Sequence, residues 1–319
     1  MADIKIEIVY QASMPTIRQL TYLVALSEQK HFRRAAESCH VTQPTLSAQI
    51  KDLEVRLGIA LLERRRGRVL LTPGGEAVLE RAKRILRDVD EIRAIAAADQ
   101  GVLETTIRIG VVQSLGSYLL PLIVPDLHAE FPKLGLYVRE GLPETLLRKL
   151  DEGAFDLLFF PMPIRQEDLD SMNLFREPIE VVLPCDHPLA AEEAIEPKML
   201  KAETVLAMER GHRLSEQVRD LCETFGAELS HDYEGTSLDT LRQMVALGMG
   251  ISLLPALYVR SEVRPQDLVI ARPFRGNPPS RIIGLVWRRG TAREAEYRSL
   301  GTTICRILRD QAPEVSIIS

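Results

Sequence analysis

The sequence predicts an α/β protein in which a small helical domain and one long helix precede a larger region of alternating strands and helices. Three observations support this fold class. Apolar residues recur at helical spacing through residues 16–57, a heptad pattern runs through residues 78–96, and short apolar strands alternate with amphipathic helices from residue 106 onward. The chain has 319 residues, 45% of them hydrophobic, so we expect two or three domains with substantial cores.

Residues 32–57, FRRAAESCHVTQPTLSAQIKDLEVRL, fit two amphipathic helices separated by a short break. Thr42 is a good N-cap for the second helix, and Pro44 lies in its first turn, where a missing N–H does no harm. The inward positions of this helix are Leu46, Ile50, Leu53 and Leu57. The opposite face carries small amide and hydroxyl side chains that can read base edges, whereas an ordinary solvated helix would carry more charge. The pattern predicts a helix-turn-helix whose second helix enters the major groove of DNA.

Two further segments complete a winged domain. Residues 16–29 form a third helix, with Leu20, Leu23 and Val24 turned inward. Residues 60–75, ALLERRRGRVLLTPGG, alternate around Arg66 and Gly67 like a small β-hairpin, with arginines at Arg64, Arg65, Arg66 and Arg68. A solvated charged loop is the alternative, but beside a recognition helix these arginines predict contacts to phosphate or to the minor groove. Arg34 is expected to join them at the DNA.

The charge of the chain is unevenly distributed. Its net charge is -5, yet residues 14–72 hold ten Lys/Arg against five Asp/Glu and are therefore basic. The remainder of the chain holds 30 basic and 40 acidic residues. A basic first domain on an acidic body places electrostatic attraction where phosphate is met, which favours a regulator that binds nucleic acid.

Thr72 and Pro73 begin a long helix that runs to about residue 98. Its apolar seam consists of Val78, Ala82, Ile85, Val89, Ile92 and Ala96, spaced alternately by four and three residues. At about 1.5 Å per residue the helix is roughly 38 Å long, more than a domain of about 60 residues can cover. The seam therefore predicts a partner helix from a second copy of the chain, and hence a homodimer.

The region from residue 106 alternates strands with helices, which predicts a mostly parallel sheet covered on both faces. The expected strands lie at residues 107–112, 135–139, 156–160, 179–183, 204–207, 232–235, 250–254 and 282–287. The expected helices begin at residue 118 or cover residues 143–152, 214–225, 238–247 and 292–309. About 215 residues exceed one such sheet, so we expect two α/β subdomains with a cleft between them.

Ligands of such folds bind beyond the carboxyl ends of strands. That rule selects Ser114 after the first strand, and Thr236 and Ser237 ahead of a helix. Helix capping explains the second pair equally well, because residues 236–239 resemble a capping box.

Taken together, these segments resemble the LysR-type transcriptional regulators over residues 14 to about 309. The motifs that carry the resemblance are HFRRAAESCHVTQPTLSAQIKDLE and LLERRRGRVLLTPGG. Within that family the chain most resembles the OxyR group of peroxide-responsive activators, through SCHVTQPTLS, SYLLP, FPKL, TSLDTLRQMVALGMGISLLPAL and IGLVW. The resemblance implies double-stranded promoter DNA and a small-molecule effector as partners, with RNA polymerase as a further partner.

The resemblance also implies a domain plan. A winged helix-turn-helix occupies residues 14–72, a dimerising linker helix residues 73–100, and a two-lobed effector domain like a periplasmic binding protein residues 105–319. Subdomain I comprises residues 105–177 and 281–319, and subdomain II residues 178–280. Two such dimers form a homotetramer. By match to the family pattern, the residues at the DNA are Gln43, Pro44, Thr45 and Ser47, with Arg64 in the wing.

One position departs from the OxyR pattern. Proteins of that group carry a peroxide-reactive cysteine directly after Gly-His, and a resolving cysteine nine residues later. Here Arg213 follows Gly211 and His212, while Cys222 stands at the resolving position. Ser114 keeps a hydroxyl where the group has a threonine beside its peroxide pocket. A guanidinium group cannot be oxidised, so the two-cysteine disulfide cannot form within one chain.

Three possibilities for the signal therefore stay open. An organic anion can bind Arg213, which lies near the positive end of a helix; the candidate effector-binding residues are Ser114, His212, Arg213, Thr236 and Ser237. Peroxide can act through Cys222 if a nearby arginine lowers its pKa, but its place on the apolar stripe of a helix predicts a buried, inert thiol. The third possibility is a regulator without a signal.

Other classes of protein find little support. The sequence contains no Gly-rich phosphate loop, GxSxG elbow or paired-carboxylate motif, so neither an enzyme nor a cofactor is expected. The four cysteines lack CxxC spacing and the six histidines form no ligand pair, which argues against a metal site. No apolar run reaches about 18 residues and the first residues do not form a signal peptide, so we expect a cytoplasmic, nucleoid-associated protein. Whether residues 1–13 are native stays open.

Overall fold

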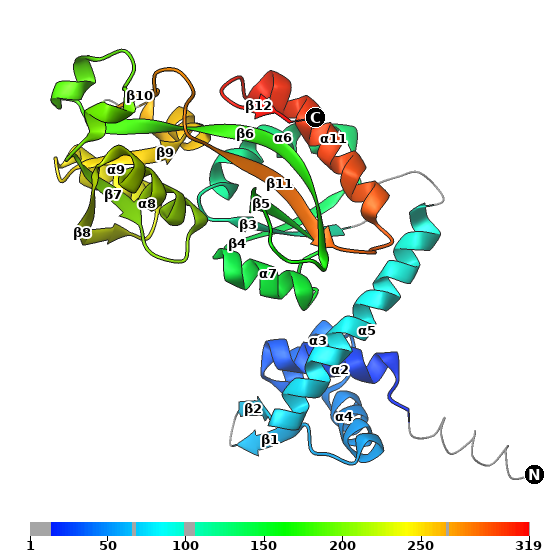
Figure 1. Ribbon diagram of the computed structural model, residues 1–319. Coiled ribbons are helices and arrows are strands. Elements are labelled where there is room, and N and C mark those ends of the chain that lie inside the picture. The colour runs from blue at the N-terminus through cyan, green and yellow to red at the C-terminus, as the bar shows by residue number, and fades with distance from the viewer. Residues whose placement is uncertain (1–13, 66–67, 99–105, 266–267, 319) are drawn as a thin grey trace, which may run out of the picture. The chain divides into compact units, whose positions relative to one another are not determined.

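The computed structural model describes residues 14–65, 68–98, 106–265 and 268–318 (Figure 1). The chain forms two compact units, residues 1–99 and residues 100–319. The strand-like alternation within residues 1–13, and Arg66 and Gly67 at the turn of the expected hairpin, lie outside the described residues.

Three helices form the core of the N-terminal unit, as the apolar spacing predicts. They are α2 (Ile17–Gln29), α3 (Phe32–Ser38) and α4 (Gln43–Leu57). Their fully buried side chains are Leu23, Leu26, Ala35, Leu46, Ile50 and Leu53. α2 begins with a capping box: the Thr16 hydroxyl accepts a hydrogen bond from the Gln19 N–H, and the Gln19 side chain accepts one from the Thr16 N–H.

Helix α4 begins and ends where the sequence indicates. The Thr42 hydroxyl accepts a hydrogen bond from the backbone N–H of Thr45, and Gly58 ends the helix in the left-handed conformation with φ of 68°. The segment that follows folds back as β1 (Leu62–Arg65) and β2 (Arg68–Leu71), which pair antiparallel. The expected wing is therefore a β-hairpin.

Helix α5 (Pro73–Ala98) is a single helix of 26 residues. The first part of its apolar seam packs within the N-terminal unit, where Ala82 is buried and Val78 is half-buried. Further along, Ile85 and Ile92 are 42% and 65% exposed. The side chain of Ala96 lies outside the described part. An exposed apolar stripe on a single copy is what a dimerising helix requires, and the homodimer itself stays a prediction.

The C-terminal unit consists of two α/β lobes joined through one long strand, β6 (Leu169–Pro184) (Figure 1). Lobe I contains β3 (Thr106–Val112), α6 (Gly116–Glu130), β4 (Gly135–Gly141), α7 (Pro143–Asp151), β5 (Leu157–Met162), β11 (Ser280–Arg288), α11 (Glu294–Gln311) and β12 (Ser316–Ile317). Lobe II contains β7 (Thr204–Met208), α8 (Arg213–Phe225), β8 (Glu228–Gly235), α9 (Leu238–Ala246), β9 (Ile251–Pro255), α10 (Ala256–Tyr258) and β10 (Val269–Arg272). Each lobe encloses its own apolar core, so the two expected subdomains are present.

The expectation of a mostly parallel sheet is wrong at the centre of this unit. The strand order is β4-β3-β5-β11-β6-β9-β7-β8, and β10 and β12 also pair with β6. The pairs that involve neither β6 nor β11 are parallel, namely β3 with β4 and β5 in lobe I, and β7 with β8 and β9 in lobe II. Every pair that involves β6 or β11 is antiparallel. The reason is that the chain passes from lobe I to lobe II along β6 and returns in the opposite direction along β11.

The sequence reading also missed part of the strand that joins the lobes. The expected strand at residues 179–183 covers only the end of β6, whose first half contains Asp170, Ser171 and Asn173 and so lacks an apolar run. β10 and β12 were not expected either. Among the described residues, no helix is long and apolar enough to cross a membrane, and no group of three or more His, Cys, Asp or Glu side chains could hold a metal ion.

Candidate functional site

The surface of α4 that the sequence assigns to DNA is accessible. Gln43, Pro44 and Thr45 are exposed and Ser47 is half-buried, while Arg34 on α3 is exposed. The Thr45 hydroxyl lies 2.8 Å from that of Thr42, so the first turn of the helix is held by both its backbone and its side chains. In the wing, Arg64 and Arg68 lie on the two paired strands; their side chains and Arg66 are outside the described part. The contacts of all these residues with DNA stay predictions.

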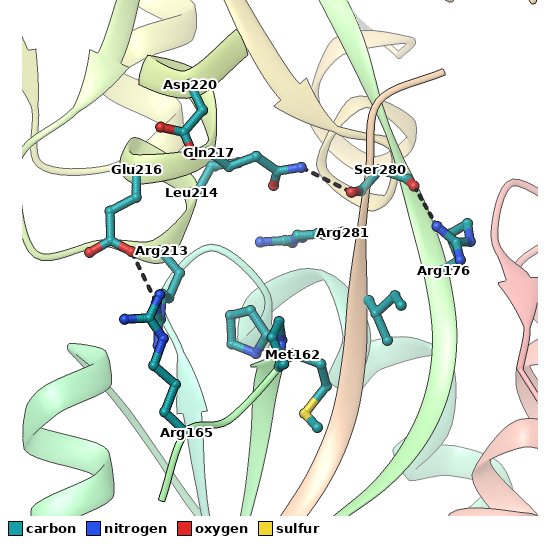
Figure 2. Close-up of a pocket in the computed structure, with 13 residues that line it drawn as sticks. Met162, Arg165, Arg176, Arg213, Leu214, Glu216, Gln217, Asp220, Ser280 and Arg281 are labelled. Carbon is teal, nitrogen blue, oxygen red and sulfur yellow. Dashed lines mark hydrogen bonds and ion pairs between the residues drawn. The ribbon is translucent and has the colours of Figure 1, made fainter. Parts of the chain in front are cut away.

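A pocket of about 330 Å³ lies where the two lobes meet (Figure 2). Its walls come from the end of β5 and the residues after it, from β6 and β11, and from the first turns of α8. The charged residues that line it are Arg165, Arg176, Arg213, Arg281, Glu216 and Asp220. Its apolar lining is Pro161, Met162, Pro163, Leu214 and Ile282. Four guanidinium groups beside an apolar wall make an environment suited to a small organic anion.

Three of the four guanidinium groups are only lightly engaged. Arg213, at the start of α8, makes one contact of 3.2 Å from its Nη1 to Glu216 Oε2, and the two side chains are 32% and 60% exposed. Arg176 donates to the Ser280 hydroxyl at 3.1 Å. The guanidinium of Arg165 has no hydrogen-bond or ion-pair partner among the described residues. These groups can therefore turn to a ligand at little cost.

Arg281 differs from the other three because it is buried and held on several sides. Its Nε donates to Glu177 Oε2 at 2.8 Å, its Nη1 to the Ser114 hydroxyl at 2.7 Å, and its Nη2 to the Ser114 carbonyl at 2.9 Å. The other oxygen of Glu177 accepts from the backbone N–H of Leu257 at 2.9 Å. Arg281 thus ties the loop after β3 in lobe I to β6, and through Glu177 to the start of α10 in lobe II.

Of the five residues that the sequence suggested for an effector, the structure brings only Arg213 to this pocket. Ser114 is buried behind it, with its hydroxyl committed to Arg281. Ser237 caps α9, where its hydroxyl accepts from the Thr240 N–H at 3.2 Å, so the capping explanation accounts for it. Thr236 precedes it and is exposed, away from the lining.

His212 precedes α8 and is buried. The Glu209 Oε1 lies 3.8 Å from the His212 Nε2, beyond hydrogen-bonding distance. Burial lowers the pKa of His212, and the weaker attraction of Glu209 does not reverse that shift. Burial therefore favours the neutral form of His212, whose side chain does not line the pocket.

Cys222 lies on the opposite face of α8 and is 3% exposed. Burial raises the pKa of its thiol to about 11, and although the charge of Arg219 acts in the opposite direction it does not compensate. A thiol that stays protonated near neutral pH is a poor nucleophile toward peroxide. The expectation that Cys222 is a buried core residue is confirmed.

Sequence reasoning missed most of the pocket. Arg165 stands in the loop after β5 and Arg176 in the middle of β6, and a single arginine at either place forms no sequence pattern. Arg281 did offer a signal, because it is a charge within the apolar run RIIGLVW, and charged residues inside such strands are almost always paired.

Comparison with known proteins agrees with the fold. Residues 17–76 match the model of the bacterial regulatory helix-turn-helix protein, lysR family, and residues 100–304 match the LysR substrate binding domain. These two matches correspond to the helix-turn-helix unit and to the two-lobed unit. The chain belongs to the LysR family of DNA-binding transcriptional regulators.

The relatives narrow this class further. The chain is 43% identical over 288 residues to the hydrogen peroxide-inducible genes activator of Pectobacterium carotovorum subsp. carotovorum, covering 90% of this chain and 95% of that protein. It is 42% identical to the DNA-binding transcriptional dual regulator OxyR of Escherichia coli (strain K12), covering 90% and 94%. Among solved structures it is similar to a full-length OxyR variant from Pseudomonas aeruginosa, with a TM-score of 0.76, 35% identity, and 93% and 97% of the two chains covered. The resemblance to the OxyR group of activators is confirmed.

Proposed function

We propose that this regulator binds promoter DNA through α4 and the wing, and that an organic anion in the arginine-lined pocket controls that binding. The observation that carries the proposal is the set of Arg165, Arg176 and Arg213, three guanidinium groups whose only ionic partner in the described residues is the exposed Glu216. Charge-assisted hydrogen bonds from such groups to a carboxylate are short and strong. A volume of about 330 Å³ suits a small ligand.

Fluorescence anisotropy on labelled promoter DNA tests this proposal. The purified regulator is titrated with benzoate, succinate and inorganic phosphate at constant ionic strength, so that screening is the same in every titration. We expect one of the carboxylates to change the affinity for DNA. In Arg213→Ala, the concentration of that carboxylate needed for the same change should rise at least about tenfold. Arg148→Ala is the matched control, since Arg148 is an exposed arginine paired with a glutamate outside the pocket. An unchanged response in Arg213→Ala would refute the anion site.

A second candidate signal is hydrogen peroxide, sensed through Cys222. The observation that favours it is the identity with peroxide-inducible activators, together with the similarity to a Corynebacterium glutamicum OxyR mutant bound to H2O2 (TM-score 0.66, 28% identity). Arg213 in place of a cysteine and the raised pKa of Cys222 argue against it. In a reporter strain, we expect Cys222→Ser to leave any response to peroxide unchanged. Loss of that response in Cys222→Ser would favour the peroxide signal instead.

The DNA contacts are proposed to divide into two kinds. Thr45→Ala is expected to lower discrimination between specific and random sites by about 1–3 kcal/mol, because a base contact is lost. Arg34→Ala and Arg66→Ala are expected to weaken binding to all sequences and to flatten its salt dependence, because phosphate contacts are lost. Equal behaviour of both kinds of variant in gel-shift titrations over a range of salt would show that the groove assignment is wrong.

We further propose a homodimer through residues 73–100, and a homotetramer of two such dimers that contacts RNA polymerase at the promoter. This assembly acts in the cytoplasm on nucleoid DNA, without enzymatic activity and without a cofactor. Ile85→Asp with Val89→Asp should give monomers in sedimentation velocity, because a charge at the seam must be desolvated or break the contact. Arg81→Asp, at an exposed position of the same helix, is the control. Intact dimers in the double variant would rule out the linker helix as the interface.

A further inference from the structure

We propose that Glu216 is an internal competitor of the effector. Its carboxylate holds the place on Arg213 that the carboxylate of a small organic acid takes, and it moves to Arg219 when the acid binds. The inference rests on the proposed function of the arginine-lined pocket and assigns to that pocket a residue that sets how tightly it binds.

The first support is the geometry of the resting pair. Glu216 Oε2 lies 3.2 Å from Nη1 of Arg213, and only one hydrogen bond joins the two side chains. Arg213 carries five N–H donors, so most of its hydrogen-bonding capacity is unused by this contact. The Glu216 side chain is 60% exposed, and exposed ion pairs that are joined by only one hydrogen bond contribute little free energy. In Figure 2 the Glu216 carboxylate points from α8 toward Arg213, to which a dashed line joins it. A ligand carboxylate can therefore displace it.

The second support is a second cavity on the other side of Glu216. A pocket of about 310 Å³ is lined by Arg210, Gly211, Ser215, Glu216 and Arg219, so Glu216 lines both pockets. Arg213, Glu216 and Arg219 are spaced by three residues on one helix, which places each next to the following one. Among the described residues neither Arg210 nor Arg219 has an ion-pair partner. The guanidinium group of Arg219 is therefore able to pair with the Glu216 carboxylate when that carboxylate leaves Arg213.

Charge balance explains why the exchange is favourable. When a ligand carboxylate binds Arg213, it replaces the charge of Glu216, which gains Arg219 in return. Asp220 lies one turn beyond Glu216 and also lines the effector pocket, so an anion there meets like charge on that side. The carboxylate head is therefore directed to the Arg213 end, and the apolar body of the acid toward Met162, Leu214 and Ile282.

Isothermal titration of the full-length protein with benzoate, succinate and inorganic phosphate at constant ionic strength tests the inference. We expect Glu216→Gln to bind the effective carboxylate about three- to fivefold more tightly, because the competitor is gone. Asp220→Asn removes the same charge from the same pocket without freeing Arg213, and should give a smaller gain. Arg219→Gln should weaken binding of the carboxylate ligand by about two- to fivefold, because the displaced Glu216 carboxylate no longer has a guanidinium group to pair with.

The double variant Glu216→Gln with Arg219→Gln isolates the exchange. The Glu216→Gln variant has no carboxylate that could pair with Arg219. In that background, Arg219→Gln should therefore leave the affinity for the ligand unchanged. An equal gain from Glu216→Gln and Asp220→Asn, or an effect of Arg219→Gln that persists in the double variant, would overturn the competitor role while leaving the anion site intact. Failure of every probe to bind both the wild-type protein and Glu216→Gln would instead overturn the anion site itself.

Discussion

The two faces of α8 carry the two chemistries that could serve as a sensor, and they are solvated very differently. One face presents Arg213 and Glu216 to the pocket as a loosely held, exposed pair. The other buries Val218 and Cys222 in the core of lobe II. A partly solvated charge can exchange partners with a small molecule, whereas a buried thiol is held in its neutral form. Position on the helix, rather than residue type alone, decides which side chain can respond to a signal.

The largest effect should come from the buried arginine of the pocket rather than from the exposed one. Glu177→Leu leaves the guanidinium of Arg281 buried without a carboxylate, which we expect to cost about 3–5 kcal/mol of unfolding free energy. Urea denaturation followed by the fluorescence of Trp287, the single tryptophan of the chain, measures it. Glu177→Leu with Arg281→Met is the control and should recover most of the loss. A loss below about 1 kcal/mol in the single variant would show that the ion pair of Arg281 contributes as little to stability as an exposed pair such as that of Arg213.

Reactivity of the thiol is the next test. With a pKa near 11 instead of the ordinary value of about 8.5, Cys222 should be alkylated by iodoacetamide more than ~100-fold more slowly in the folded protein than in urea. Between about pH 8.5 and about pH 11, the thiol of Cys222 stays protonated in the folded state but loses its proton in the unfolded chain. The stability conferred by the neutral thiol should therefore be complete below about pH 8.5 and be lost as the pH rises toward about 11. Mass spectrometry of alkylated peptides, and urea denaturation of wild type and Cys222→Ala across this range, measure the two effects. Rapid alkylation in the folded protein would remove the contrast between the faces.

A smaller effect is expected from the hydroxyl analogue of the buried thiol. Cys222→Ser should destabilise the protein by about 1–3 kcal/mol, because a buried hydroxyl without a hydrogen-bond partner pays for its desolvation. Cys222→Ala, which introduces no polar atom, should cost less. Circular dichroism during urea denaturation compares the two variants. Equal stability of Cys222→Ser and wild type would mean that this face is wetter than its 3% exposure indicates.

The smallest effect belongs to the exposed face. Arg213→Ala should change the unfolding free energy by no more than about 1 kcal/mol, because its pair with Glu216 is solvent-exposed. The same denaturation assay measures this change. A loss of several kcal/mol would show that Arg213 supports the fold, and its effect on effector binding could then not be assigned to the pocket.

The N-terminal unit shows how far local pattern can reach. The periodicity of Leu46, Ile50 and Leu53, the cap at Thr42 and the stop at Gly58 all act over a few residues, and each is found where the sequence indicates. The burial of Cys222 could likewise be predicted from its place on the apolar stripe of one helix. The pairing of β6 with β11 could not, since it joins residues about a hundred positions apart through backbone hydrogen bonds that leave little trace in composition.

The sequence by itself determined that the chain is a helix-turn-helix regulator of the LysR type and that Arg213 directly follows Gly211 and His212, because both facts lie in short, continuous motifs. Only the tertiary structure decided what surrounds that arginine. Arg165, Arg176 and Arg281 reach the pocket from segments that are distant in the chain and meet Arg213 only where β6 and β11 bring the lobes together. It also decided that Arg281 and Ser114 hold each other, because a buried charge must find partners within reach of its side chain wherever the fold supplies them.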